Sequence, residues 1–260
     1  MTLTFLGTGT SVGIPMIGCD CATCTSTDPR DQRLRSSVYL STPEASWVVD
    51  TGPDFRMQCL RERIRRVDAA LYTHPHMDHV TGFDDLRRFC IEEDAFLPIH
   101  AAPSCLAALQ RMYEHAFNGQ NRYRGYLKPQ PMPIDGPFNI GDTHVTPLPV
   151  KHGKVETFGY LFTRHGRKLC AYLSDMKEPL PGTLELMEGV DTLIIDALRN
   201  TPHPTHMNFP EALAFREAVK PRITWFTHLQ CEILHARAEA LLPHDVRIAY
   251  DGLKLAWPSP

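Results

Sequence analysis

The segment Thr73-His74-Pro75-His76-Met77-Asp78-His79 sets three histidines and one carboxylate within six residues, directly after the apolar run Val67 to Tyr72. Imidazole nitrogen and carboxylate oxygen are ligands that suit zinc, manganese or iron. Four such groups this close cannot all bind one tetrahedral ion, because the backbone would have to fold back on itself. The H-x-H pair can bind one ion, while the following Asp-His pair reaches a second. The spacing therefore predicts two neighbouring metal ions, an arrangement typical of the hydrolysis of phosphoesters and other charged esters.

Three further candidate ligands each follow directly after an apolar run; they are His152, Asp175 and His228. Each is weak evidence alone, because a lone histidine at the end of a strand is usually structural. Histidine clusters also occur in affinity tags, surface loops and single structural sites, but the mid-chain position of the first motif excludes a tag. Together, and in this order, these residues favour a catalytic metal site.

The composition of the 260-residue chain, 43% of it hydrophobic, suits one large domain or two small ones, and we expect a single domain over residues 1–260. The net charge of -3 and the pI of about 6.5 argue against binding of extended nucleic acid through a broad basic face. We interpret the local basic cluster as a solvated helix face rather than a binding patch; its members are Arg61, Arg63, Arg65 and Arg66.

The chain has no apolar run long enough to span a membrane, so we expect no membrane partner. Its start, Met1 to Thr10, is unlike a secretion signal because it lacks a basic leader and glycines interrupt its apolar run. We therefore expect a cytoplasmic protein whose eight cysteines are reduced.

Short apolar runs typical of strands recur along the chain, and several end in a carboxylate, as at Asp50, Asp175 and Asp196. The runs cover residues 3–6, 37–40, 47–49, 69–72, 144–148, 159–163, 169–173, 192–195, 223–227 and 246–249. Amphipathic patterns typical of helices lie between them, at 54–65, 81–92, 104–116, 208–219 and 229–242. The alternation favours a layered α/β domain with its carboxylates at one rim of a sheet.

Residues 118–133 are polar, basic, aromatic and proline-rich, which predicts an exposed loop. The functional alternative is a lid over the site. In that case an anionic substrate would be contacted by Arg122, Tyr123, Arg124 or Tyr126.

With these ligands the chain resembles the metallo-β-lactamase superfamily, and the N-terminal strand and glycine turn extend the resemblance to nearly the full chain. The matching parts are Asp50-Thr51-Gly52, the first histidine motif, His152, Asp175 and His228. The resemblance implies an αββα sandwich of the α/β (α+β) class with a dinuclear site at one edge. It assigns His74, His76 and His152 to one ion, Asp78, His79 and His228 to the other, and Asp175 to both. Asp50 would orient a histidine ligand and fix its tautomer.

The chemistry agrees with this assignment. A bridging carboxylate holds two ions about 3.5–4 Å apart, and the metal-bound hydroxide between them attacks phosphorus or carbonyl carbon near neutral pH. A bridging Asp175 argues against a true β-lactamase, which usually has a different ligand there. Histidine at the second ligand position, His76, argues against a flavodiiron-type oxidoreductase.

A second metal-binding pattern, Gly18-Cys19-Asp20-Cys21-Ala22-Thr23-Cys24, sets three cysteines too close for comfortable mutual disulfides. C-x-C-x-x-C can fold round one zinc as three thiolates, and a structural zinc needs a fourth ligand. Cys231, three residues past His228, is the best candidate. Such a zinc would tie the N-terminal loop to the strand end that carries His228 and would stiffen the site. The alternative is three unligated thiols in a loop.

The cysteine loop, the Leu6-Gly7-Thr8-Gly9-Thr10 turn and Ser174-Asp175 together resemble the PhnP-type phosphodiesterases, the phosphoribosyl cyclic phosphodiesterases of phosphonate breakdown. That family has a structural zinc made by the same loop and by a histidine three residues past the last histidine ligand. Cys231 departs from this pattern, but conservatively for zinc. A homodimer is suggested by the resemblance alone.

His206 lies where this family and the tRNA 3′-processing nucleases have a histidine near the leaving group. We expect it to donate a proton or to hold the phosphate, the alternative being a surface histidine before a helix. His203 is a weaker competitor, and Arg199 and Asn200 in the same loop are candidate phosphate contacts. The candidate catalytic residues are therefore His206 and the metal ligand Asp78.

We therefore expect a dinuclear metal-dependent phosphodiesterase that hydrolyses a small, nucleotide-like or sugar phosphodiester, with cyclic diesters included. The ligands permit zinc, manganese or iron as the two catalytic ions, and one structural zinc completes the set. A tRNA 3′-processing endoribonuclease is the nearest alternative, weakened by the acidic pI and the lack of a long insertion. A thioesterase or lactonase comes third. A non-catalytic accessory protein of cofactor biosynthesis is disfavoured by the complete ligand set.

Overall fold

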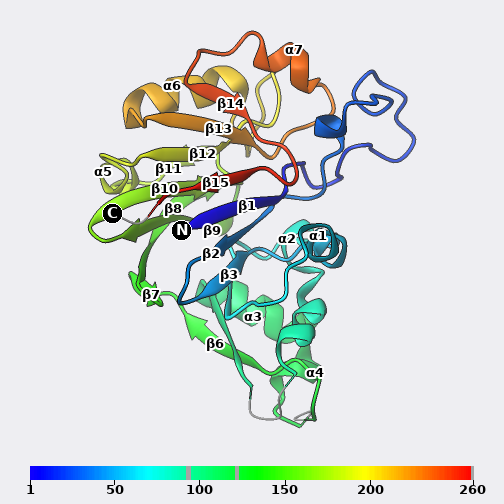
Figure 1. The fold of residues 1–260 in the computed structure, drawn as a ribbon, viewed down its shortest axis with the longest axis vertical. Helices are drawn as coiled ribbons and strands as arrows, with labels where there is room; N and C mark the ends of the chain where they lie inside the picture. Colours follow the sequence, from blue (N-terminus) through cyan, green and yellow to red (C-terminus); the bar gives the residue numbers. More distant parts are fainter. Residues whose placement is uncertain (92–94, 121–122, 259–260) are drawn as a thin grey trace.

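The computed structural model describes residues 1–91, 95–120 and 123–258, and packs two mixed β-sheets face to face (Figure 1). The first sheet consists of β1 (Thr2–Gly7), β2 (Ser37–Ser41), β3 (Ser46–Val49), β4 (Ala69–Leu71), β5 (Leu97–Ala101), β6 (Pro129–Pro133) and β15 (Lys254–Ala256), in the order β15-β1-β2-β3-β4-β5-β6. The second consists of β7 (Phe138–Ile140), β8 (Thr143–His152), β9 (Val155–Arg164), β10 (Arg167–Leu173), β11 (Glu178–Pro179), β12 (Thr192–Asp196), β13 (Ile223–Thr227) and β14 (Val246–Ile248). Its order is β11-β8-β9-β10-β12-β13-β14, with β7 beside β8.

Each sheet is antiparallel on one side and parallel on the other. In the first sheet β15, β1, β2 and β3 pair antiparallel, and β3 to β6 pair parallel. In the second sheet β7 to β11 form the antiparallel part, whereas β10, β12, β13 and β14 pair parallel. Because parallel strands share one direction, the loops that follow their carboxyl ends gather at one edge of each sheet, where ligands bind in such folds.

Helices cover the outer face of each sheet, so the molecule has four layers (Figure 1). The first sheet is covered by α1 (Phe55–Glu62), α2 (Met77–Val80), the 3-10 helix η2 (Phe83–Phe89), α3 (Pro103–Met112) and α4 (Glu114–Phe117). The second is covered by α5 (Thr183–Leu186), α6 (Phe209–Val219) and α7 (His235–Glu239), and a short 3-10 helix, η1 (Pro29–Asp31), lies in the N-terminal loop. The αββα sandwich that the sequence predicts is confirmed.

The central core lies between the two sheets, where their inward side chains interdigitate. Trp47 of β3 and Phe162 of β9 are both fully buried, with ring centroids 5.9 Å apart. A capping box begins α6, since Asn208 and Glu211 each accept from the other's backbone N–H. Among the described residues no helix combines the length and the hydrophobicity that crossing a membrane requires.

All ten expected strands are present, but two expected helices are wrong. Residues 229–242 contain only the short α7, because Leu229 and Gln230 instead pair with the backbone of Thr8 and Leu198. Residues 81–92 contain the 3-10 helix η2 rather than an α-helix, and Glu92 lies outside the described residues.

The loop expected at 118–133 is wrong at its end. Residues Pro129–Pro133 form the edge strand β6, parallel to β5. Prolines obscure such a strand in the sequence because they cannot donate to a ladder, yet an edge position tolerates them. The strands β5, β7, β11 and β15 were also not expected.

Candidate metal centre

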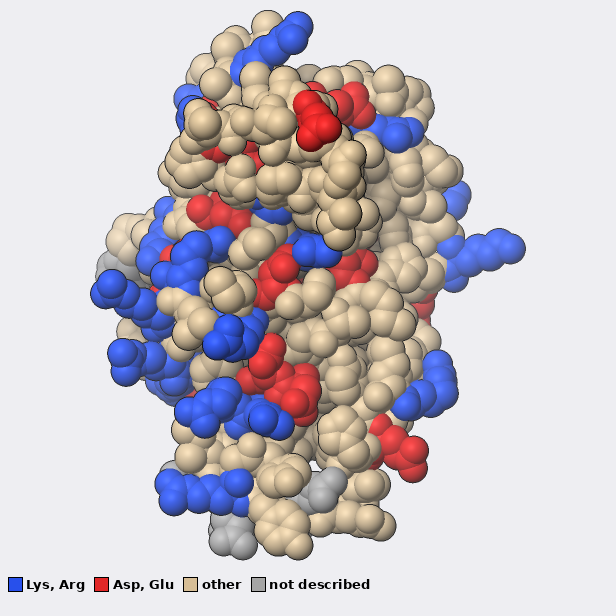
Figure 2. All heavy atoms as spheres, turned by 90° about the vertical axis from the view of Figure 1, so that its right-hand side faces the viewer, with Lys and Arg blue, Asp and Glu red and all other residues tan. Residues whose placement is uncertain are grey.

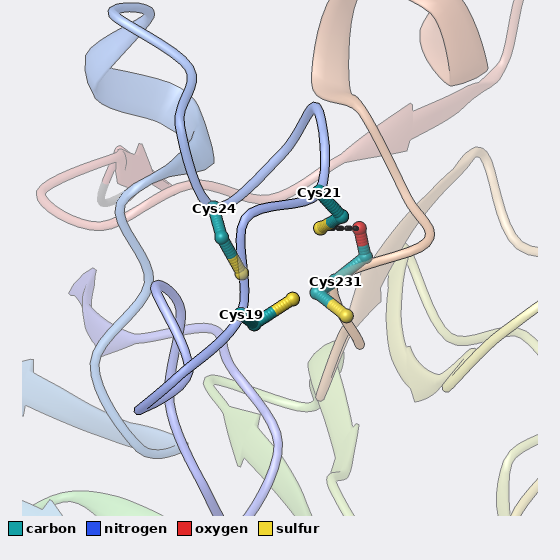
Figure 3. A group of neighbouring side chains, drawn as sticks. All are labelled: Cys19, Cys21, Cys24 and Cys231. Carbon is teal, nitrogen blue, oxygen red and sulfur yellow. Dashed lines mark hydrogen bonds between the residues drawn. The ribbon is translucent and has the colours of Figure 1, made fainter.

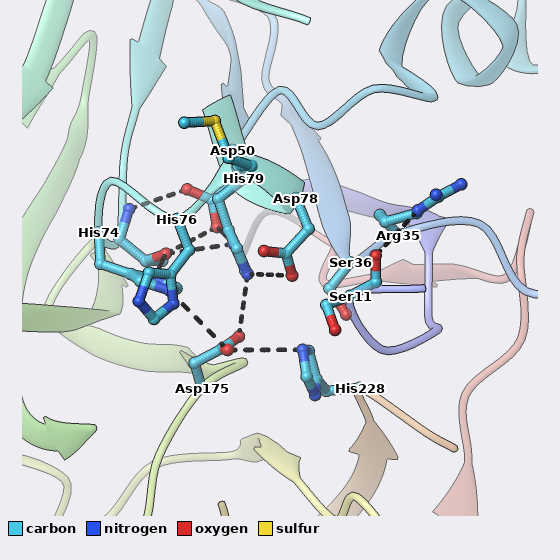
Figure 4. A network of polar contacts seen from close by, with 12 residues as sticks. Ser11, Arg35, Ser36, Asp50, His74, His76, Asp78, His79, Asp175 and His228 are labelled. Atoms are coloured by element: carbon cyan, nitrogen blue, oxygen red, sulfur yellow. Dashed lines mark hydrogen bonds and ion pairs between the residues drawn. The ribbon is translucent and has the colours of Figure 1, made fainter. Parts of the chain in front are cut away.

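The predicted metal ligands come from four separate segments that meet at one edge of the sandwich, and Figure 4 labels all of them except His152. His74 to His79 follow β4, His152 ends β8, Asp175 follows β10 and His228 follows β13. His228 and Asp50 hold left-handed backbone conformations, with φ of 58° and 63°. Such conformations are uncommon for residues other than glycine, and they cluster at functional sites.

The three histidines expected at the first ion turn their ring nitrogens toward one another. Nε2 of His74 and Nε2 of His152 lie 2.8 and 3.3 Å from Nδ1 of His76. The other ring nitrogen of His152, Nδ1, donates to the carbonyl oxygen of Thr205 at 3.0 Å, so its lone pair is on Nε2. Imidazole nitrogens that converge in this way suit a shared cation.

Asp175 lies between this group and the one expected at the second ion, which consists of Asp78, His79 and His228. Its Oδ1 is 3.3 Å from Nε2 of His79, and its Oδ2 is 3.4 Å from Nε2 of His228. The same Oδ2 is 3.7 Å from Nε2 of His152 in the first group. On the other side of the second group, Nε2 of His79 is 3.2 Å from Oδ2 of Asp78. Asp175 therefore has the position of a bridging ligand.

The buried Asp50 sets the tautomers of two of these histidines. Its carboxylate accepts from the backbone N–H and the hydroxyl of Thr73, and from Nδ1 of His79, each at 2.8 Å. A carboxylate only accepts, so His79 holds a proton on Nδ1, and Nε2 is the nitrogen that an ion could bind. Since the Thr73 hydroxyl donates to Asp50, its oxygen accepts from Nδ1 of His74 at 3.0 Å. His74 is thereby also left with its lone pair on Nε2.

The protonation of the centre is consistent with cation binding. Burial lowers the pKa of His74 well below its usual value, and burial lowers the pKa of His228 to about 4, so both rings are neutral. Burial opposes the charge on His79 as well, but Asp175, Asp50 and Asp78 more than offset it and raise its pKa well above the usual value. Three carboxylates round one imidazole attract positive charge, which a divalent ion would supply.

Several buried polar atoms of the centre have no hydrogen-bond partner within the described part of the chain: Nε2 of His79, Nε2 of His228 and Oδ1 of Asp175. Burying such an atom without a partner costs about 1–3 kcal/mol. These atoms are nitrogen and oxygen donors of the kind that bind zinc, manganese or iron, and they face one another. The residues present therefore fit a pair of divalent ions.

His206 joins the centre together with Asp196, which the sequence analysis noted only as a carboxylate at the end of a strand. Nδ1 of His206 donates to Oδ2 of the fully buried Asp196 at 2.7 Å, and its Nε2 is 4.0 Å from Oδ2 of Asp175. Burial alone would lower the pKa of His206, but the charge and the hydrogen bond of Asp196 raise it to about 9. Asp196 ends β12, and the apolar run ending in a carboxylate was the signal that could have identified it.

A cavity of about 410 Å³ opens onto these groups. Besides ligands and His206, it is lined by Ser11, Thr205 and the turn Gly153-Lys154-Val155. Lys154 is the one lysine or arginine among these lining residues, and it forms no ion pair within the described chain. The sequence analysis missed it, although it follows the ligand His152 by two residues.

Other predicted substrate contacts lie elsewhere. Arg199 and Asn200 are not among the described residues that line the cavity, and the guanidinium of Arg199 donates instead to the carbonyl oxygens of Thr201 and Pro202, at 3.1 and 2.7 Å. The described part of the segment 118–133 does not line the cavity either, so the lid is not supported. Arg122 lies outside the described residues.

The four cysteines expected at a structural zinc form one group, with their sulfur atoms within 4.8 Å of one another (Figure 3). The loop supplies Cys19, Cys21 and Cys24, and Cys231 comes from the segment after β13. A hydrogen bond from the Cys24 backbone is the main cause that lowers the pKa of Cys21 to about 7, which favours its thiolate. Four converging sulfurs fit a closed tetrahedral zinc site.

Comparison with known proteins agrees with this geometry. Residues 47–229 match the family model described as the beta-lactamase superfamily domain. The chain therefore belongs to the metallo-β-lactamase superfamily of metal-dependent hydrolases, as its motifs predict. It is similar to a solved structure described as a new diphosphatase from the PhnP family, with 37% identity and a TM-score of 0.89 over 98% of this chain and 96% of that one.

Two curated relatives carry different names. The chain is 33% identical to an octanoyltransferase of Porphyromonas gingivalis, over 98% of this chain and 51% of the relative. It is 26% identical to a ribonuclease Z of Bradyrhizobium diazoefficiens, over 75% of this chain and 61% of the relative. The chain thus spans only half to three fifths of the length of these relatives.

Proposed function

We propose that this hydrolase is a dinuclear metal-dependent phosphodiesterase that acts on small phosphodiesters. The observation that carries the proposal is the position of Asp175, with oxygens facing the ligands of both groups, His152 on one side and His79 and His228 on the other. Two-metal hydrolysis of a phosphodiester uses two ions held close together, and a carboxylate shared between two ligand groups would hold them so. The similarity to a PhnP-family diphosphatase supports phosphorus rather than carbon as the centre attacked.

The residues would divide between two kinds of metal site. The first catalytic ion would be held by His74, His76 and His152, the second by Asp78, His79 and His228, and Asp175 would join them. When bound, zinc or manganese ions supply Lewis acidity and an activated water. The group of Cys19, Cys21, Cys24 and Cys231 would hold a structural zinc that joins the N-terminal loop to the segment after β13.

The protein's own groups would orient these ligands and move protons. Asp50 holds Nδ1 of His79 and, through Thr73, that of His74, so that their free nitrogens face the ions. His206 holds one proton on Nδ1 against Asp196. A second proton on its Nε2, which faces the centre, would pass to the oxygen of the leaving group. The raised pKa of His206 supports this role, because it keeps the ring protonated near neutral pH.

The substrate would be small, because the cavity measures about 410 Å³. The ribonuclease Z relative keeps a tRNA 3′-processing activity as the second candidate. The octanoyltransferase relative is about twice as long as the matched region, so acyl transfer is not carried over to this chain. Acyl esters and thioesters nevertheless make suitable comparison substrates.

The proposal is tested by comparing substrates on the metal-loaded protein. We expect turnover of bis(p-nitrophenyl) phosphate that stops on chelation and returns with zinc or manganese, and little turnover of p-nitrophenyl octanoate or an octanoyl thioester. Faster hydrolysis of the acyl substrates than of the diester would replace the proposal with a thioesterase or esterase. Cleavage of a tRNA precursor in preference to small diesters would favour the nuclease.

A further inference from the structure

A groove of about 590 Å³ lies between α1 and η2, on the outer face of the first sheet. Its walls are formed by the residues 55–65 and 85–91, and none of its lining residues lines the metal cavity. Figure 2 looks onto the side of the molecule that carries α1 and α2, and shows Lys and Arg side chains gathered on one side of this face. The groove is therefore a second concave surface, separate from the metal centre.

The groove has an apolar floor and aliphatic side chains at its rim. Phe55 is buried beneath it, and Cys59, Ile64 and Phe89 are half-buried. Leu60 is 58% exposed and Ile91 is 39% exposed. Large aliphatic side chains left this open inside a groove are typical of a surface that a partner covers.

Arginines surround this floor. The lining residues include Arg56, Arg65, Arg87 and Arg88, against the single carboxylate of Asp85. Burial and the neighbouring Asp84 raise the pKa of Asp85, whereas Arg56 and Arg87 lower it. Of the four arginines only Arg87 forms an ion pair within the described residues, with Asp84 at 3.3 Å. This excess of free guanidinium groups lies on a chain whose net charge is -3.

We propose that this groove binds an acidic, amphipathic segment of a partner protein, in the form of a helix with an apolar stripe flanked by Asp and Glu. The apolar stripe would cover the floor near Leu60 and Ile91, and the carboxylates would pair with Arg56, Arg65 and Arg88. Helix-in-groove recognition combines these two features. Arginine suits such contacts because its planar fork pairs with carboxylates in a bidentate way.

The chemistry of the groove favours protein over nucleic acid. Single-stranded nucleic acid binds with its bases stacked on exposed aromatic rings. The two aromatic residues that line the groove, Phe55 and Phe89, are buried and half-buried, so neither offers an open ring face. The aliphatic rim instead suits leucine-like side chains. Arg65, which the sequence analysis interpreted as part of a solvated helix face, is here assigned to a binding surface.

The position of the groove implies recruitment rather than catalysis. Its walls begin shortly after two segments of the metal centre, since α1 follows Asp50 and η2 follows His79. The two walls are joined where Gly82 packs on Gly52. The contact is so close that a Cβ atom added to either glycine would overlap a backbone oxygen. A bound partner would thus be held beside the metal centre without entering its cavity.

The test uses fluorescence anisotropy with a labelled amphipathic peptide of about five helical turns that has leucines on one face and glutamates on its flanks. We expect saturable binding to the metal-loaded protein, weakened about 10- to 100-fold by the double variant Arg56→Glu/Arg88→Glu and weakened by salt. Leu60→Ser should also weaken it. The matched control Arg167→Glu/Lys220→Glu, on a basic surface lined by Gly166 and Val190, should bind the peptide like the wild type.

Three outcomes would overturn the proposal. The first is equal binding of a scrambled peptide of the same charge, which would show only non-specific attraction. The second is tighter binding of a single-stranded RNA that is lost in the same double variant. The third is a dimer in sedimentation that Arg56→Glu/Arg88→Glu converts to a monomer, which would assign the groove to a second copy of this chain. Unchanged thermal unfolding of the variants controls for misfolding.

Discussion

Replacing Asp50 with asparagine tests the tautomer argument most sharply. Asparagine has the same shape, and it tolerates the left-handed φ of 63° that Asp50 holds. Its Oδ1 can still accept from the Thr73 backbone. Its amide nitrogen, however, would replace the oxygen that accepts from the Thr73 hydroxyl and from Nδ1 of His79. His79 would then place its proton on Nε2, the nitrogen that faces the second ion.

The expected loss follows from two independent magnitudes. A hydrogen bond to a charged group contributes about 1.5–3 kcal/mol. Removing the partner that orients a histidine ligand typically weakens metal binding by about 10- to 100-fold, which corresponds to about 1.4–2.8 kcal/mol. The two ranges agree. We therefore expect Asp50→Asn to bind one of the two catalytic ions about 10- to 100-fold more weakly.

The assay is competition for metal with a chromophoric chelator, on the wild type, Asp50→Asn and the control Asp68→Asn. The carboxylate of Asp68 caps the backbone of Ser46 and pairs with Arg66, away from the centre. Thermal unfolding of each metal-free variant controls for misfolding. Equal affinity for both ions in Asp50→Asn and the wild type, within about twofold, would refute the argument.

Three further substitutions are expected to separate the roles of the other groups. Asp196→Asn should lower kcat by about 10²- to 10⁴-fold, as we also expect of His206→Ala, and more for alkyl than for p-nitrophenyl leaving groups. An equal effect on both leaving groups would refute the proton-transfer role. Lys154→Ala should raise KM for a diester that carries a second phosphate, but leave KM for bis(p-nitrophenyl) phosphate unchanged. As the control, Lys151→Ala, at a lysine that pairs with Glu178, should change KM for neither substrate. Cys231→Ala should release zinc and lower the unfolding temperature. Because the thiols must lose protons to bind zinc, the wild type should retain less zinc as the pH is lowered. Retention of zinc by Cys231→Ala would exclude Cys231 as a ligand.

The sequence could predict the parts of the centre that are local in the chain. The histidine motif and the cysteine loop carry most of their ligands within a few residues, so spacing alone indicates metal binding. The strands around them are apolar and regular enough to place these segments at sheet edges. The alternation predicted a layered α/β domain, and the family resemblance alone implied the αββα sandwich.

The parts that sequence analysis missed depend on contacts between distant segments. Asp196 is an ordinary strand-end carboxylate until β12 and the loop before α6 bring it to His206. Lys154 and Arg199 look equally suited to bind phosphate, and only the packing shows that Lys154 faces the cavity while Arg199 binds its own loop. The groove likewise lies between α1 and η2, two segments whose packing the sequence does not show. The sequence also predicted a regular helix where η2 is a 3-10 helix.

The central claim is that Asp175 joins two metal ions in one hydrolytic centre. The most direct measurement is metal content by elemental analysis of the wild type and Asp175→Ala, paired with hydrolysis of bis(p-nitrophenyl) phosphate. We predict about three ions per wild-type chain, one of them resistant to chelation, and about one ion with no turnover in the variant. A wild type without metal at the histidine groups, or an Asp175→Ala protein that keeps both ions and its turnover, would contradict the account.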